Sequence, residues 1–455
     1  MRDLAFIGFL AGLLALGLKR PFLFVLAYVY VDTVSPQRLS YILLNSIPLS
    51  LIVALLAMGG WAIADRKDQM SFTVRQGLLL VLLAYAGATT FYADFPVDAA
   101  EKWDWAWKTI VFAVFLPFTL RTKLRLEAVL LFLTLSAAAI IIVGGIKTVL
   151  SGGGYGVLNL MVDNNSGLYE SSTISTIAIA IIPIILWFTR HGTIFPPDWR
   201  VKIFAAGLIF ACLLMPIGTE ARTGLVCIAV LAVLMLRDAR RRFLYIAGAG
   251  LLGLASIPFL PASFTNRMGT MQELQADESA GTRLAVWAWT WDYAQHHPFG
   301  GGFGAYRSNR IQVVTVNTQS SGDVQVVTAA MQSDEARAYH SAYFEMLGEQ
   351  GFPGLFLFLL INAIGLVRME MIRRRYRRRD GEEAWIAPLA TALQHFQIIY
   401  MVGELFVGIA YQSFGWLVFG VQIGLDTWLA RREKAERKAG VGFAPRMAKS
   451  LLPTA

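Results

Sequence analysis

Long apolar runs separated by short polar segments repeat along most of the chain. A run of about 20 apolar residues can cross roughly 30 Å of hydrocarbon as an α-helix. The pattern therefore predicts an all-α polytopic membrane protein with about 12 or 13 transmembrane helices. The predicted spans are residues 4–18, 21–34, 41–64, 76–92, 106–120, 125–149, 173–189, 202–217, 223–237, 243–260, 353–372, 386–406 and 409–430.

The first two runs are short and leave one alternative open. They form either two spans or a single hairpin that lies in the membrane interface. The number of spans and the side of the N-terminus therefore stay open. The first run also lacks a basic leader and a small-residue cleavage site, so we expect no cleavable signal peptide.

Lysines and arginines gather in every second loop between the predicted spans. Short loops on the cytoplasmic side of a membrane carry such an excess of positive charge. We therefore place the basic loops in the cytoplasm, where they also contact lipid head groups. They contain Lys19–Arg20, Arg66–Lys67 with Arg75, Arg121–Arg125, Arg190–Lys202, Arg237–Arg242, Arg373–Arg379 and the tail from Arg431 onward.

The alternate loops then lie outside the cytoplasm, and the segment 261–352 is much the longest of them. Within it, Ala280 to His296 has helical spacing and several tryptophans, which is typical of a helix lying along the membrane interface. A glycine-rich turn, His297–Gly304, ends this helix. The alternation from Ile311 to Val327 indicates a small hairpin or a flap. The predicted organisation is N-terminal spans (1–190), core spans (191–260), the large outer loop (261–352), C-terminal spans (353–430) and a basic cytoplasmic tail (431–455).

Composition agrees with a membrane protein, because 56% of the residues are hydrophobic and only 16% are charged. The net charge of +9 does not indicate nucleic-acid binding, since most lysines and arginines lie beside the spans.

Cys212 and Cys227 both fall inside apolar runs, so we expect buried small side chains rather than a disulfide or a metal pair. Zinc-type Cys/His spacing, a P-loop and a dinucleotide fingerprint are missing from the sequence. We therefore expect no cofactor and no metal site.

Several arginines stand in the outer loops, where positive charge is disfavoured. Arg222 lies in the short turn Gly218–Gly224 between two spans. Arginine binds phosphate oxygens bidentately, so a group of them would suit a phosphate-bearing ligand. The alternatives are an ion pair with Glu220 or head-group contact for Arg222, and solvated loop charges for the others. The other candidates lie in the long loop: Arg283, Arg307, Arg310 and Arg337.

His340 stands where the long outer loop returns to the membrane, next to the hydroxyl of Ser341. A neutral imidazole at such a boundary can take a proton from an incoming hydroxyl near neutral pH. Glu345 follows about one and a half helical turns later. It can orient the histidine only if the next helix begins late; otherwise it is a solvated carboxylate in the interface.

Three motifs in this region resemble a known family. They are His340-Ser341 followed by Gly351 and Gly354, Arg222 in Glu-Ala-Arg-Thr-Gly, and Arg283 followed by Trp287 and the Pro298-to-Gly304 segment. Together, in the chain order Arg222, Arg283 and His340, they resemble the O-antigen ligase and O-antigen polymerase superfamily, which includes bacterial O-oligosaccharyltransferases. Residues 1–190 and the arginine-rich loop before the last two spans most resemble putative O-glycosylation ligases associated with exosortase-type systems. Ala221 departs from the motif, which often has serine there.

The resemblance implies a GT-C-like glycosyltransferase in the bacterial inner membrane, with its site facing the periplasm. Its donor would be a glycan on undecaprenyl pyrophosphate, and the glycan would pass en bloc to an acceptor hydroxyl of a lipid, a protein or a polysaccharide, without metal. His340 would be the general base, and Arg222 and Arg283 would stabilise the pyrophosphate. The substrate-binding candidates are Arg307, Arg310, Arg337, Glu345 and Ser341.

Two other functions remain as alternatives. An O-antigen-type polymerase would extend a lipid-linked glycan with the same chemistry and a different acceptor. A transporter or flippase of a lipid-linked sugar would also fit the number of spans and the basic loops. Transporters, however, place charged features near the middle of the bilayer, whereas here they cluster at one face.

Overall fold

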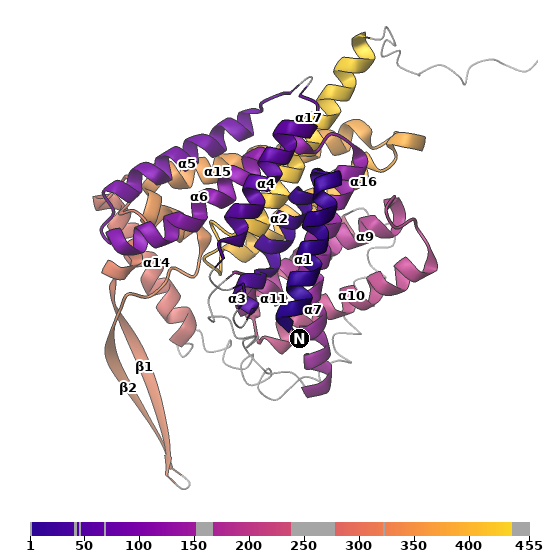
Figure 1. Cartoon of the computed structure of the whole chain (residues 1–455). Helices are drawn as coiled ribbons and strands as arrows, with labels where there is room; N and C mark the ends of the chain where they lie inside the picture. The colour runs from indigo at the N-terminus through magenta and orange to yellow at the C-terminus, as the bar shows by residue number, and fades with distance from the viewer. Residues whose placement is uncertain are drawn as a thin grey trace, which may run out of the picture.

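The computed structural model describes residues 2–40, 43–44, 47–67, 70–151, 167–237, 278–321 and 324–438. The predicted span 243–260, the start of the outer loop (261–277) and the end of the basic tail (439–455) lie outside these residues. The described chain is a bundle of long helices with one β-hairpin (Figure 1). Its helices are α1 (Arg2–Lys19), α2 (Phe22–Val34), α3 (Pro36–Leu39), α4 (Leu49–Ala64), α5 (Val74–Phe91), α6 (Pro96–Thr119), α7 (Lys123–Ser151), α8 (Ser171–Ala180), α9 (Ile182–His191), α10 (Trp199–Gly218), α11 (Arg222–Leu236), α14 (Glu278–His296), α15 (Ala342–Tyr376), α16 (Ile386–Glu404) and α17 (Ser413–Lys438).

Within the described chain, five helical segments are long and apolar enough to cross a membrane. Shorter apolar helices accompany them, namely α2, α4 and α11. Large apolar side chains face outward in mid-helix: Leu55 is 60% exposed and Val233 69%. Such a surface suits hydrocarbon rather than water. The predicted all-α polytopic membrane fold is thus confirmed. The five segments are α5, Lys123–Leu150 of α7, the kinked pair α8–α9, α10 and α15.

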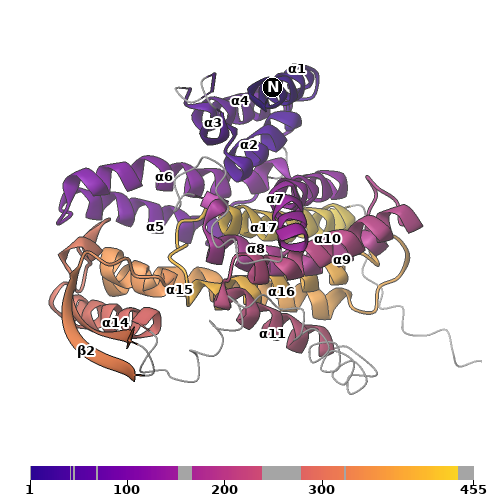
Figure 2. The ribbon, with the colours of Figure 1, turned by 90° about the horizontal axis from the view of Figure 1, so that it is seen from below.

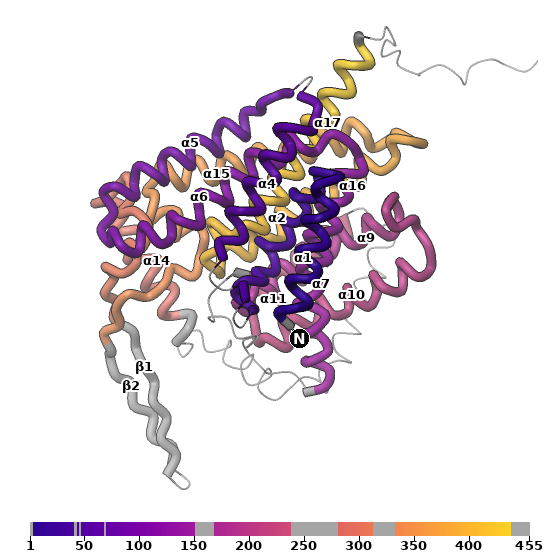
Figure 3. The backbone as a smooth tube through the Cα atoms, in the orientation of Figure 1, coloured from indigo at the N-terminus to yellow at the C-terminus, as the bar shows by residue number. Residues whose placement is uncertain are grey.

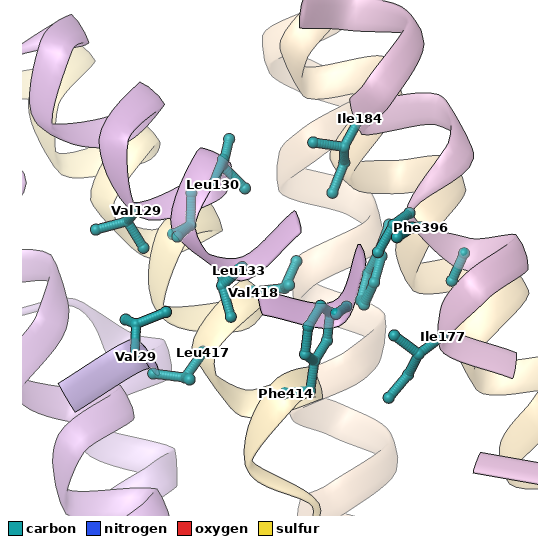
Figure 4. Packing of buried hydrophobic residues seen from close by; sticks show 14 of the residues in the cluster. Val29, Val129, Leu130, Leu133, Ile177, Ile184, Phe396, Phe414, Leu417 and Val418 are labelled. Carbon is teal, nitrogen blue, oxygen red and sulfur yellow. The ribbon is translucent and has the colours of Figure 1, made fainter. Parts of the chain in front are cut away.

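The first two helices differ in their surroundings. Helix α2 belongs to the main core, where Val29 is fully buried and packs near Val129 and Leu417 (Figure 4). Helix α1 lies against α2 at the outside of the bundle (Figure 2). Its neighbours α4 and α7 bury most of α2, so that helix packs inside the bundle. The choice between two spans and an interfacial hairpin stays open.

The two ends of the bundle carry different structures. The arginine-rich end of α15, the α15–α16 connection and the end of α17 lie together at the upper right of Figure 1. Helix α14 and the β-hairpin lie at the opposite end. The hairpin joins β1 (Arg310–Ser321) to β2 (Val324–Glu335), with Arg310 opposite Glu335. The predicted outer helix and hairpin are therefore both present, and they stand at the end away from that arginine-rich connection.

A break in α15 separates a short first segment, residues 342–350, from the long apolar part. Gly351 has φ +63° and ψ −166°, which are not helical values. The Phe352 N–H donates to Pro298 O at 3.0 Å, and the Gly301 N–H donates to Gly348 O at 3.1 Å. The turn 298–304 is thereby fixed against the break. The chain path from the hairpin base into this segment can be followed in Figure 3.

Replacing Gly351 should destabilise this junction. A Cβ atom there would lie 2.2 Å from Pro298 O and 2.5 Å from Gly300 N, and the positive φ adds strain of about 1–3 kcal/mol for other residues. We expect Gly351→Ala to unfold at a clearly lower temperature in detergent. Gly59→Ala is the matched control, because a Cβ at Gly59 has nothing within 4 Å. Equal melting of the two variants would contradict the tight junction.

Candidate functional site

His340 lies between β2 and α15 with its backbone fixed on both sides. Its φ of +48° is rare for a residue other than glycine, so its surroundings must hold it. On one side, Trp287 Nε1 on α14 donates to Tyr339 O at 2.9 Å. On the other side, Ser341 Oγ donates to Glu404 O at 3.4 Å, at the end of α16. His340 as a residue is exposed, so a substrate can reach it.

Arg283 is brought close to His340 by α14. Four residues after it, Trp287 stacks on Phe344 with ring centroids 5.0 Å apart. Partial desolvation by the surrounding protein lowers the pKa of His340, and the positive charges of Arg283 and Arg337 lower it further. The carboxylate of Glu170 acts in the opposite direction. The result favours a neutral imidazole at neutral pH, which is the form that a general base requires.

This charge environment predicts the pH dependence of any reaction that uses His340 as a base. Activity should fall as pH drops through the pKa of His340, with the inflection below its ordinary value of 6.5. Arg337→Gln removes a cation, so the inflection should move to higher pH; Glu170→Gln removes an anion, so it should move to lower pH. The measurement is kcat/KM against pH at low salt, where such charges are least screened. A common inflection in all three proteins would exclude His340 as the titrating base.

Arg222 begins α11, and α8 links that position to the surroundings of His340. Thr219, in the turn before Arg222, has its hydroxyl hydrogen-bonded to the hydroxyl of Ser175 at 2.8 Å. Ser175 belongs to α8, and Glu170 caps the same helix by accepting from its Thr173 N–H. Glu170 is also one of the charges that act on His340. The turn before Arg222 thus contacts the middle of α8, and the N-cap of the same helix carries one of the charges that act on His340.

The three other arginines predicted to bind substrate are engaged in ion pairs. Arg307 pairs with Asp98 at 2.7 Å, and Arg337 pairs with Asp334. Arg310 pairs with Glu335 at 3.2 Å, with the two side chains 80% and 61% exposed. The Arg310 pair matches the solvated loop charge that was the alternative for this residue. Their predicted substrate contacts remain predictions.

Glu345 is paired with a lysine and is not a solvated carboxylate. Helix α15 begins early, at Ala342, and Glu345 is buried in its first turn. Its carboxylate accepts from Lys102 Nζ at 2.6 Å and from the Ala410 N–H at 3.1 Å. The expectation of a solvated carboxylate was wrong, because Glu345 is buried against Lys102 of α6, and the condition for a direct orienting role, a late start of the helix, is not met. Its predicted substrate contact stays a prediction.

The same region contains two charged residues that sequence reasoning missed, Lys102 and Glu349. Lys102 lies in the predicted outer loop 93–105, where positive charge is disfavoured. A search for lysines as well as arginines in the outer loops would have found it. Glu349 is fully buried between Gly348 and the break at Gly351. Nothing in its spacing from His340 indicated that it would meet a lysine from α6.

Two family models match parts of the chain. Residues 206–359 match the family described as O-antigen ligase. The chain contains an O-antigen ligase domain. That domain includes Arg222, Arg283 and His340, and it extends past the helix break. The resemblance to the O-antigen ligase superfamily is therefore confirmed.

The part of the chain before the O-antigen ligase domain matches a different family. Residues 1–193 match a family of unknown function, DUF5935. No curated protein matches the chain. The predicted association with exosortase-type systems stays a prediction. The O-antigen ligase domain indicates a membrane-embedded enzyme of the glycan-transferring class, acting on a lipid-linked glycan and an acceptor.

Proposed function

We propose that this protein transfers a glycan en bloc from undecaprenyl pyrophosphate to an acceptor hydroxyl. The observation that supports this proposal is that Arg283, on α14, lowers the pKa of His340 by its positive charge, and that both residues fall in the segment matching the O-antigen ligase family. The site lies at the end of the bundle opposite the arginine-rich end of α15. By the positive-inside rule, the arginine-rich end faces the cytoplasm, so the end with the site faces the periplasm of the bacterial inner membrane.

The chemistry requires one base and a stabilised leaving group. His340 takes the proton of the acceptor hydroxyl as the acceptor oxygen forms a bond to the anomeric carbon of the donor sugar. The bond between that carbon and the pyrophosphate oxygen breaks, and its electron pair leaves with undecaprenyl pyrophosphate. Arg283 and Arg222 hold the negative charge that grows on the pyrophosphate, so no metal ion is needed. Fixed cations in a partly dry site stabilise such charge strongly.

Membrane lipids and the acceptor complete the set of proposed partners. The outward apolar faces of α4 and α11 would contact lipid, and nucleic acid has no part in the reaction. The acceptor hydroxyl belongs to a lipid, a protein or another glycan. A ligase and a polymerase differ only in that acceptor, and both use the same base and the same leaving group.

The experiment uses purified protein in liposomes that contain the lipid-linked glycan donor, with acceptors of each class added in turn. We expect one acceptor class to gain glycan while undecaprenyl pyrophosphate is released. The sugar–pyrophosphate bond must break in this reaction. Movement of intact donor across the bilayer, with no released undecaprenyl pyrophosphate, would instead support a flippase and contradict the proposal.

A further inference from the structure

Three charged residues at the start of α6 reach the elements that form the candidate site. Asp94, Asp98 and Lys102 recur every four residues, from the turn before α6 into its second turn. Asp94 accepts a hydrogen bond from Tyr293 on α14, the helix that carries Arg283. Asp98 pairs with Arg307 just after the glycine-rich turn. All three belong to the segment that matches the family of unknown function.

Lys102 makes the most buried of these contacts. Its Nζ lies 2.6 Å from Glu345 Oε1 and 2.7 Å from Glu349 Oε2. The side chains of Glu345 and Glu349 are only 9% and 1% exposed. The ammonium also lies over the rings of Phe303 and Tyr411, at 5.4 and 5.2 Å. Two dry carboxylates therefore share one cation.

The two carboxylates belong to the short first segment of α15, directly after His340. Glu345 and Glu349 are four residues apart and so face the same side of that helix. Glu349 also accepts from the Gly304 N–H at 3.2 Å, which ties the helix to the glycine-rich turn. Replacing Lys102 would therefore alter the contacts of the first segment of α15, which begins beside His340. It would also alter those of the glycine-rich turn 298–304, which packs against the break at Gly351.

We propose that Lys102 is a positioning residue for glycan transfer: through Glu345 and Glu349 it sets the segment that places His340. This inference rests on the proposed function, and it gives the N-terminal segment a direct part in the reaction. Lys102 touches no substrate in this scheme. A displacement of about 1 Å in a catalytic group can reduce a rate by roughly 100-fold. Loss of Lys102 should accordingly lower kcat while leaving donor binding in place.

The test compares Lys102→Met with Lys108→Met in the reconstituted full-length enzyme, with activity expressed per amount of monodisperse protein. Lys108 is a matched control on the same helix, because it pairs with Asp104, whose side chain is 73% exposed. We expect Lys102→Met to lose about 100-fold in kcat with the donor KM within about twofold. Lys102→Arg should regain most of the loss, and Lys108→Met should behave as the wild type.

A charge-free variant separates positioning from simple stability. Lys102→Met combined with Glu345→Gln and Glu349→Gln leaves no unpaired buried charge, so it should fold even if the single variant folds poorly. Low kcat in this folded variant supports positioning. Wild-type kcat in either variant, or a change confined to KM, would overturn the inference. An inactive wild type would instead reject the proposed function, and the two failures are thus distinguishable.

Discussion

Replacing His340 by alanine should lower the rate of glycan transfer by about 10²–10⁴-fold, the contribution typical of a general base. The acceptor hydroxyl would then have to lose its proton to water. The effect should fall on kcat, because the imidazole acts on the acceptor and leaves donor binding to the arginines. The measurement is the initial rate of undecaprenyl pyrophosphate release by purified protein, with donor affinity determined separately.

His296→Ala is the matched control for this variant. His296 is also exposed at the outer end of the bundle, at the last turn of α14. Its ring lies against the Asp292 carbonyl of its own helix at 3.0 Å. We expect this variant to retain the wild-type rate. If His340→Ala and His296→Ala transfer glycan equally well, the base is another group.

Replacing Arg283 by alanine should reduce transfer by about 10²–10³-fold, the range found when one fixed donor to a developing oxyanion is removed. Two effects add in this variant. The pyrophosphate loses a cation that stabilises its growing charge, and His340 loses a neighbour that lowers its pKa. The second effect predicts that any residual activity titrates at higher pH than in the wild type.

Arg310→Ala provides the control for Arg283. Both arginines belong to the long outer loop, but Arg310 forms an exposed pair with Glu335, and such pairs contribute little. Its variant should transfer glycan within about twofold of the wild type. Equal losses in the two variants would mean that the outer loop attracts the donor only through its overall charge.

Much of the architecture was predictable because it follows from local patterns. Length and hydropathy predict an all-α membrane fold, and the tryptophans from Trp287 to Trp291 indicated an outer helix that the structure contains. The glycine-rich turn at 298–304 also ended that helix as expected. These features depend on a few neighbouring residues. The break at Gly351 was harder, since an apolar pattern does not show where one helix docks on a distant turn.

The charged interior was not predictable from local patterns. Glu345 looked like an interfacial carboxylate because its neighbours in the sequence are compatible with exposure. Its burial depends on Lys102, which lies 243 residues away. A buried ion pair is favourable only when its partners are fixed in good geometry. That geometry comes from the packing of α6 against the rest of the bundle, which hydropathy does not specify.

The central claim is that Arg222, Arg283 and His340 act on one donor pyrophosphate. Its most direct test is the distance between cysteine-attached spin labels at positions 222 and 340 in the reconstituted protein. Cys212 and Cys227 are buried, so they should label weakly. The account predicts a Cα separation below about 20 Å, the reach of a diphosphate held between long side chains. A clearly larger separation would contradict a single site.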